Sequence, residues 1–64
     1  MIIETKFKDQ FLISVTAAEL IAINNCLNEV CHGIAVFEFE TRIGACKEDI
    51  AGMLGKISAA CRGG

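Results

Sequence analysis

The N-terminal stretch IIETKFKDQFLISV alternates between apolar and polar residues, a pattern typical of half-buried β-strands. The polar residues at 8–10 can turn the chain, so the pattern predicts a β-hairpin with strands near residues 2–7 and 11–15. Because this turn contains no glycine, we expect a loop longer than the tightest two-residue type. The side chains expected to share inward faces are Ile3, Thr5 and Phe7 in the first strand, and Phe11, Ile13 and Val15 in the second.

A capping box, Thr16-Ala-Ala-Glu19, follows the hairpin and marks the start of a helix. The helix is predicted to run from residue 17 to about residue 32 and to end at Gly33 in a left-handed conformation. At about 100° per residue, its apolar positions fall on one arc. This predicted core face consists of Leu20, Ile23, Leu27, Val30 and Cys31.

The middle segment, residues 33–44, is ambiguous. Its β-prone residues around 36–41 are compatible with a third strand, but a loop with a short helical turn ending at Gly44 is equally compatible. No second alternating strand is available to pair with it, so we favour the loop and turn.

Residues 46–61 show the apolar spacing of a second helix, with Glu48 and Asp49 suited to its N-terminal end. The complete pattern predicts an α+β fold: an N-terminal β-hairpin packed against two α-helices, with an irregular middle segment, all in one small domain over residues 1–64. The predicted core face of the second helix consists of Ile50, Met53, Leu54, Ile57 and Cys61.

Composition adds an expectation of self-association. The chain is 53% apolar, with a mean hydropathy of +0.50, yet it has only 64 residues. A chain of this size buries only about 60% of the surface that its unfolded form exposes. Part of the apolar surface therefore lacks a place inside one copy, and we expect a homo-oligomer.

Charge and hydropathy argue against two classes of partner. The net charge is −2, and the six basic residues are scattered rather than aligned along a phosphate backbone, so we expect no nucleic-acid binding. The apolar runs are far shorter than the roughly 20 residues that span a bilayer, and nothing resembles a secretory leader. We therefore expect a cytoplasmic protein that does not bind membranes.

The stretch NNCLNEVCH, residues 24–32, looks at first like a chemical site. Cys26 and Cys31 lie about 140° apart around the helix, so they cannot hold one metal ion together. Cys31 belongs to the core face, and His32 points elsewhere. Cys46, at a helix start, is better placed for a thiolate, but we interpret it as replacing a capping serine. We expect reduced structural thiols, no metal, no cofactor and no catalytic residue.

Two other features remain as candidates for binding. Asn25, Asn28, Glu29 and His32 form one polar stripe about 100° wide, which either meets a protein partner or is simply a solvated face. Asparagine is a mediocre helix former, so its repetition there favours recognition. A second strip, Gly52, Gly55 and Ala59, is either unoptimised surface or a site where a second copy packs closely; we favour packing.

The segments LNEVCHGI and FEFETRIGACKEDI resemble a pattern in small uncharacterised bacterial proteins, N-E-V-x-x-G followed by E-F-x-T-R-[IL]-G. The resemblance covers about residues 16–57 and departs at Cys46, where the pattern has a serine cap. Some of these proteins are suspected immunity or accessory proteins carried near toxin genes or on mobile elements. The resemblance thus implies partner binding and singles out Asn28, Glu29, Thr41 and Arg42.

These observations lead to a functional hypothesis and one alternative. If residues 37–43 pack beside the first helix, Arg42 can pair with Glu29 and fix the loop as a structural pair. We expect a non-enzymatic protein–protein interaction module, immunity- or accessory-like, acting as a homodimer through the polar stripe. The alternative is a small-molecule-binding regulatory domain, with an apolar pocket at the dimer interface and Asn24 as its polar group.

Overall fold

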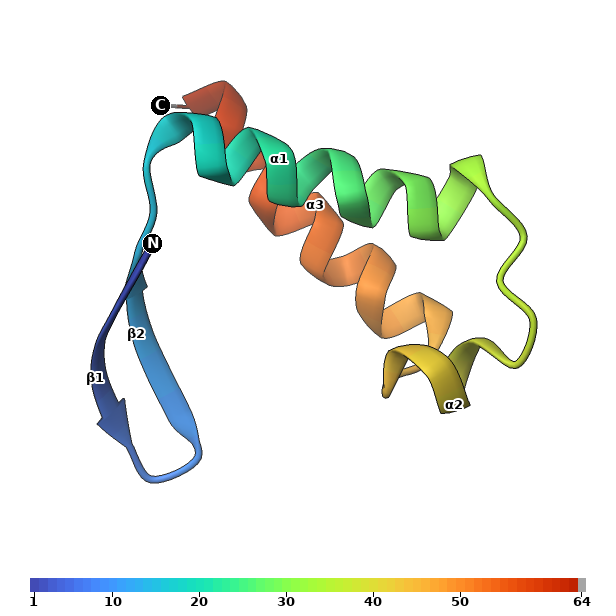
Figure 1. The fold of residues 1–64 in the computed structure, drawn as a ribbon. Coiled ribbons are helices and arrows are strands. Elements are labelled where there is room, and N and C mark those ends of the chain that lie inside the picture. The colour runs from blue at the N-terminus through green and yellow to red at the C-terminus, as the bar shows by residue number, and fades with distance from the viewer. Residues whose placement is uncertain (64) are drawn as a thin grey trace.

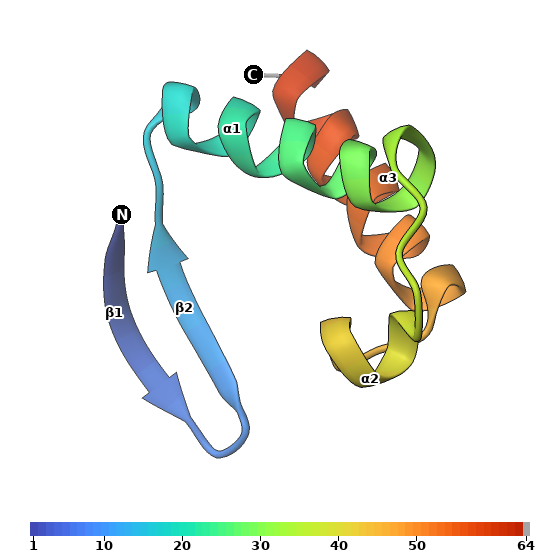
Figure 2. The ribbon, with the colours of Figure 1, turned by 45° about the vertical axis from the view of Figure 1, so that its right-hand side comes forward.

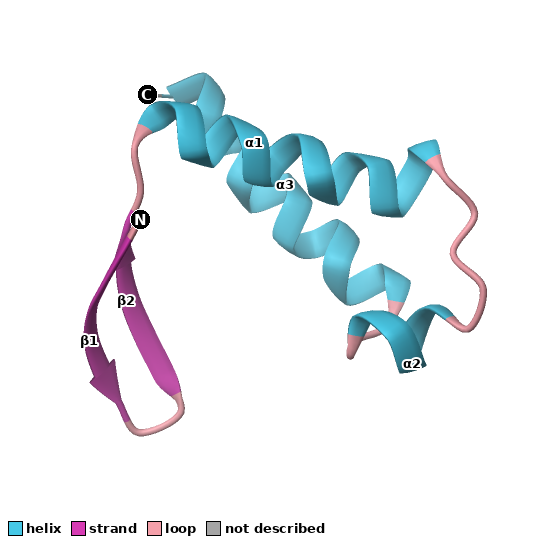
Figure 3. Ribbon diagram, in the orientation of Figure 1, coloured by secondary structure: helices cyan, strands magenta, loops and turns pink. Residues whose placement is uncertain are grey.

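The computed structural model describes residues 1–63, which form a β-hairpin followed by a series of helical elements (Figures 1 and 3). The predicted α+β class is confirmed, and the second helix is found where its apolar spacing placed it. The elements are β1 (Ile2–Phe7), β2 (Gln10–Ser14), α1 (Ala17–Asn28), the π-helical turn η1 (Glu29–Gly33), α2 (Phe39–Ile43) and α3 (Lys47–Gly63).

The hairpin turn is tighter than expected. Phe7 pairs with Gln10, so the loop contains only Lys8 and Asp9. Lys8 adopts a positive φ of 56°, the conformation that a short hairpin turn requires and that glycine would adopt without strain. The expectation of a longer loop, drawn from the absence of glycine, is therefore wrong.

A β-bulge in β1 redistributes the hairpin side chains between its two faces. The register shifts between Ile3 and Thr5, so that Ile3 lies opposite Ile13 whereas Thr5 lies opposite Leu12. Directly opposed residues share a face. Ile3 therefore lies on the other face from Thr5, contrary to the simple alternation, because the bulge inserts Glu4 as an extra residue.

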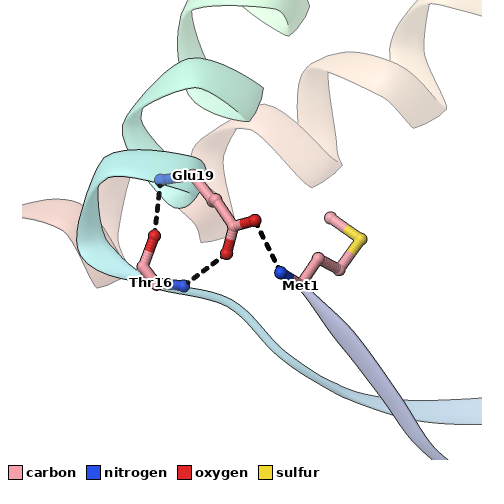
Figure 4. A network of polar contacts seen from close by, with 3 residues as sticks. All are labelled: Met1, Thr16 and Glu19. Atoms are coloured by element: carbon pink, nitrogen blue, oxygen red, sulfur yellow. Dashed lines mark hydrogen bonds and ion pairs between the residues drawn. The ribbon is translucent and has the colours of Figure 1, made fainter.

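The capping box at the start of α1 is present as predicted (Figure 4). The Glu19 backbone N–H donates to Thr16 Oγ1 at 3.1 Å, and the Thr16 N–H donates to Glu19 Oε1 at 2.9 Å. The second carboxylate oxygen of Glu19 accepts from the Met1 ammonium at 2.6 Å. These donors, led by the ammonium, lower the pKa of Glu19.

The end of the first helical segment differs from the prediction. Gly33 lies inside η1 and does not adopt a positive φ. The Ile34 N–H donates to the Glu29 carbonyl at 2.9 Å, the i→i+5 bond of a wide turn. The left-handed glycine is instead Gly44, with φ 88°, which ends α2. The preferred reading of the middle segment, a loop and short helical turn ending at Gly44, is therefore confirmed.

The core lies between the two long helices and is small. Cys31 clusters with Ile50 and Leu54 of α3, and Leu27, Phe39 and Ala45 pack against this cluster. The predicted core face of α1 is indeed its more buried side. Met53, however, is 49% exposed, because it lies at the margin of the narrow arc of α3 that a single neighbouring helix covers.

The hairpin does not pack on the helices as expected. It extends away from the α1–α3 pair, starting from the N-terminal end of α1 (Figures 1 and 2). Residues 2–13 are all exposed, and burial begins only at Ser14 and Val15. The apolar faces of α1 and α3 are turned toward each other, so neither is available to the hairpin.

Candidate functional site

The polar stripe predicted to bind a partner lies on the surface of the described structure. Asn25 and Asn28 are in α1, whereas Glu29 and His32 belong to η1, and all four are exposed. The wide turn has more residues per turn than an α-helix, so His32 is displaced from the straight line that regular periodicity predicts. Asn25 Oδ1 accepts only a long hydrogen bond, 3.5 Å, from the neighbouring Asn24. The side-chain amide of Asn25 is therefore open to solvent or to another molecule.

The predicted structural pair of Glu29 and Arg42 is not formed. Within residues 1–63, the ion pair observed is the one between the Met1 ammonium and Glu19. The Glu29 carboxylate instead lies over Gly33, where a β-carbon would overlap it. Arg42 is exposed on α2. The close approach of Glu29 gives Gly33 a role other than the left-handed helix end that we expected.

Asn24 connects the two long helices. Ser58 Oγ donates to Asn24 Oδ1 at 2.5 Å, and the contact is partly buried. Helical periodicity places Asn24 beside the core face of α1, but no local pattern identifies Ser58 as its partner. The sequence signal for this contact is that Asn24 and Ser58 are both polar and both lie at the edge of an apolar helix face. Asn24 therefore serves helix packing.

Cys31 and Cys46 are poorly placed for a reactive thiolate. All four are free thiols, and Cys31 is only 2% exposed in the apolar core. At Cys46 the Asp49 backbone N–H lowers the thiol pKa, but the Asp49 and Glu48 carboxylates and partial burial outweigh it and leave the pKa raised. Among residues 1–63, no three His, Cys, Asp or Glu side chains lie close enough to hold a metal ion.

The small-residue strip of α3 is also exposed. A β-carbon added at Gly52 or at Gly55 would meet no atom of the chain within 4 Å. Glycine inside a helix costs about 1 kcal/mol relative to alanine. Among the described residues of one copy, no neighbouring atom requires glycine at these two positions.

The largest feature that the sequence analysis missed is the apolar surface of the hairpin. Its large apolar side chains are between 44% and 67% exposed, and the bulge distributes them over both faces. The overall composition signalled excess apolar surface, but the alternating pattern placed it against the helices. These side chains are Ile2, Ile3, Phe7, Phe11, Leu12 and Ile13.

A shallow apolar pocket lies where the start of α1 meets the end of α3. It is lined by Ala17, Leu20, Ile21, Ala60 and Cys61. Asn24, which the small-molecule alternative requires as a polar anchor, is not among these residues and is bonded to Ser58. The pocket therefore lacks the polar group that would orient a ligand.

Comparison with protein-family models, curated proteins and solved structures found no match to this chain. Within the described residues, no helix is both long enough and apolar enough to cross a membrane.

Proposed function

We propose that this chain is a non-enzymatic protein–protein interaction module that acts as a homodimer. In this proposal it works in the bacterial cytoplasm as an immunity- or accessory-type protein. Dimerisation stabilises the folded chain, and the stripe of Asn25, Asn28, Glu29 and His32 contacts the partner protein. Binding to the stripe would occlude a surface of that partner.

The exposed apolar hairpin is the observation that carries the proposal. Two isolated antiparallel strands are at best marginally stable in water, and these strands gain no cover from their own helices. Contiguous exposed apolar surface on a small protein is a mark of interaction with another macromolecule. The exposure of all four stripe residues adds support, because side chains committed to the core could not contact a partner.

Cross-linking and affinity capture from bacterial lysate test the role of the stripe. We expect wild-type protein to retain a specific partner, and the double variant Asn25→Ala/Asn28→Ala to bind it at least about tenfold more weakly, because hydrogen bonds to the partner are lost. The matched control is Lys47→Ala/Lys56→Ala, which changes two exposed side chains of α3.

Equal capture by wild type and the asparagine variant would overturn the assignment of the stripe. A sedimentation measurement tests the other half of the proposal. A chain that remains monomeric at high concentration would show that the exposed apolar surface does not serve self-association.

A further inference from the structure

The free edge of β2 differs from that of β1 in its protection against pairing. In a two-stranded sheet each strand has one edge whose backbone N–H and C=O groups lack a ladder partner. β1 carries Glu4 and Lys6 and is interrupted by the bulge at Glu4. Charges and bulges are the devices that keep an edge from pairing with another strand.

The β2 edge has none of these devices. Its sequence, Gln10-Phe-Leu-Ile-Ser14, contains no charge, no proline and no bulge, and the register of β2 against β1 is continuous over Gln10–Leu12. An exposed, regular, apolar edge strand is a template for adding another strand.

The β2 sequence is complementary to itself in the antiparallel direction. Opposed residues in an antiparallel pair share a face, so a two-fold axis normal to the sheet must pass midway between the two copies of one residue. With the axis at Leu12, all five residues find partners: Gln10 opposes Ser14, Phe11 opposes Ile13, and Leu12 opposes its own copy. Aromatic–β-branched pairs such as Phe11 with Ile13 are favourable across strands.

The β2 strand also brings apolar side chains to the proposed interface. From their exposed fractions, Phe11, Leu12 and Ile13 together present on the order of 300 Å². A standard stable interface buries about 800 Å² on each partner, so pairing through β2 alone predicts a weak dimer, held mainly by backbone hydrogen bonds.

We propose that a second copy of this chain docks on β2, giving the four-stranded order β1–β2–β2–β1 about a two-fold axis at Leu12. This inference rests on the proposed homodimer and identifies its interface. The charged, bulged β1 strands then form both outer edges of the sheet. The assembly therefore closes at two copies instead of growing into a fibre.

Charge exchange at Leu12 tests this register. Leu12 is 63% exposed, so replacing it does not disturb a core within one copy. In Leu12→Lys, and likewise in Leu12→Glu, like charges would face each other across the axis. We expect each variant to raise the dimer dissociation constant by at least about 100-fold. Mixing the two variants should restore a dimer, because opposite charges then meet.

Two control variants represent rival interfaces. Lys6→Glu would destroy a dimer formed through β1, in which Glu4 and Lys6 of two copies face each other. Because Lys6 Nζ also lies 5.6 Å from the centre of the Phe11 ring within one copy, this variant should weaken the β2 dimer by less than about tenfold. Ala59→Lys would destroy a dimer packed through the small residues of α3 and should likewise have little effect. Sedimentation equilibrium measures the wild type, the four variants and the mixture of the two Leu12 variants.

The outcomes separate the interface from the function. Dissociation by Lys6→Glu or Ala59→Lys, with Leu12→Lys still dimeric, would overturn the β2 interface but leave the homodimer intact. A monomeric wild type would overturn both. As a measurement independent of variant folding, isotope-filtered NMR on wild-type protein should give nuclear Overhauser contacts between Phe11 of one copy and Ile13 of the other. Absence of these contacts in a dimer would also refute the register.

Discussion

Cys31 is the most buried side chain of the described chain, and it lies against Ile50 and Leu54 of α3. A reduced cysteine in such surroundings acts as a small apolar residue with a weakly polar thiol. A serine in the same place would bring a hydroxyl group into an apolar cluster whose side chains offer it no acceptor. The variant Cys31→Ser therefore measures the free-energy cost of burying a polar group without a partner.

We predict that Cys31→Ser lowers the free energy of unfolding by about 1–3 kcal/mol. Cys26→Ser, at an exposed position of α1, should change it by less than about 0.5 kcal/mol. Urea unfolding at one fixed protein concentration measures both. If the two variants behave alike, or if Cys31 reacts with a thiol reagent as fast as Cys26 in the native protein, Cys31 is not a core residue.

Glu19 forms the ion pair found among residues 1–63, with the Met1 ammonium, and it also accepts from the Thr16 backbone N–H (Figure 4). Its pKa is lowered in the folded chain, chiefly by the ammonium. Stability from such a group is present above the ordinary glutamate pKa and is lost as pH falls through the lowered value. Glu19→Gln keeps a capping oxygen but removes the charge.

We therefore predict that Glu19→Gln is less stable than wild type at neutral pH, and that the difference disappears in acid. The measurement is the free energy of unfolding of both proteins across this pH range. Glu40→Gln on α2 corrects for the general effect of removing one negative charge. A difference that stays constant with pH would show that the carboxylate charge of Glu19 contributes nothing.

At the scale of the elements, locally encoded features were predictable and those set by distant contacts were not. The bounds of β1 and the start of α1 follow from alternation and from the Thr16–Glu19 capping box, both contained within a few residues. β2, predicted at 11–15, begins and ends one residue earlier, because the two-residue turn brings Gln10 opposite Phe7. The wide turn η1 replaces a regular helix end in the segment where Cys31 enters the core against α3. No local pattern contains that contact.

The hairpin illustrates the same limit. Apolar alternation identified two strands correctly but could not specify the bulge at Glu4, because one inserted residue depends on how both strands align. The exposure of Asn25 and Asn28 was predictable from helical periodicity. The Glu29–Arg42 pair required the position of α2 relative to α1, which arises only from tertiary packing.

The whole molecule has a small interior when only one copy is considered. Within residues 1–63, the buried apolar residues are Cys31, Ile50 and Leu54, while the hairpin and several helical side chains expose large apolar groups. Folding must offset the conformational entropy of all the ordered residues. A chain with a small core and much exposed apolar surface gains stability when association buries that surface.

This coupling predicts that the melting temperature rises with protein concentration. For a dimer that unfolds to two free chains, each tenfold increase in concentration adds about 1.4 kcal/mol per dimer. With the usual unfolding entropy per residue, this corresponds to about 3–6 °C for two copies of a 64-residue chain. Calorimetry over a hundredfold concentration range measures the shift. Leu12→Lys should melt lower and lose the dependence, because a monomer unfolds independently of concentration. A wild-type melting temperature that stays constant over that range would mean that the small helical core is sufficient without a second copy.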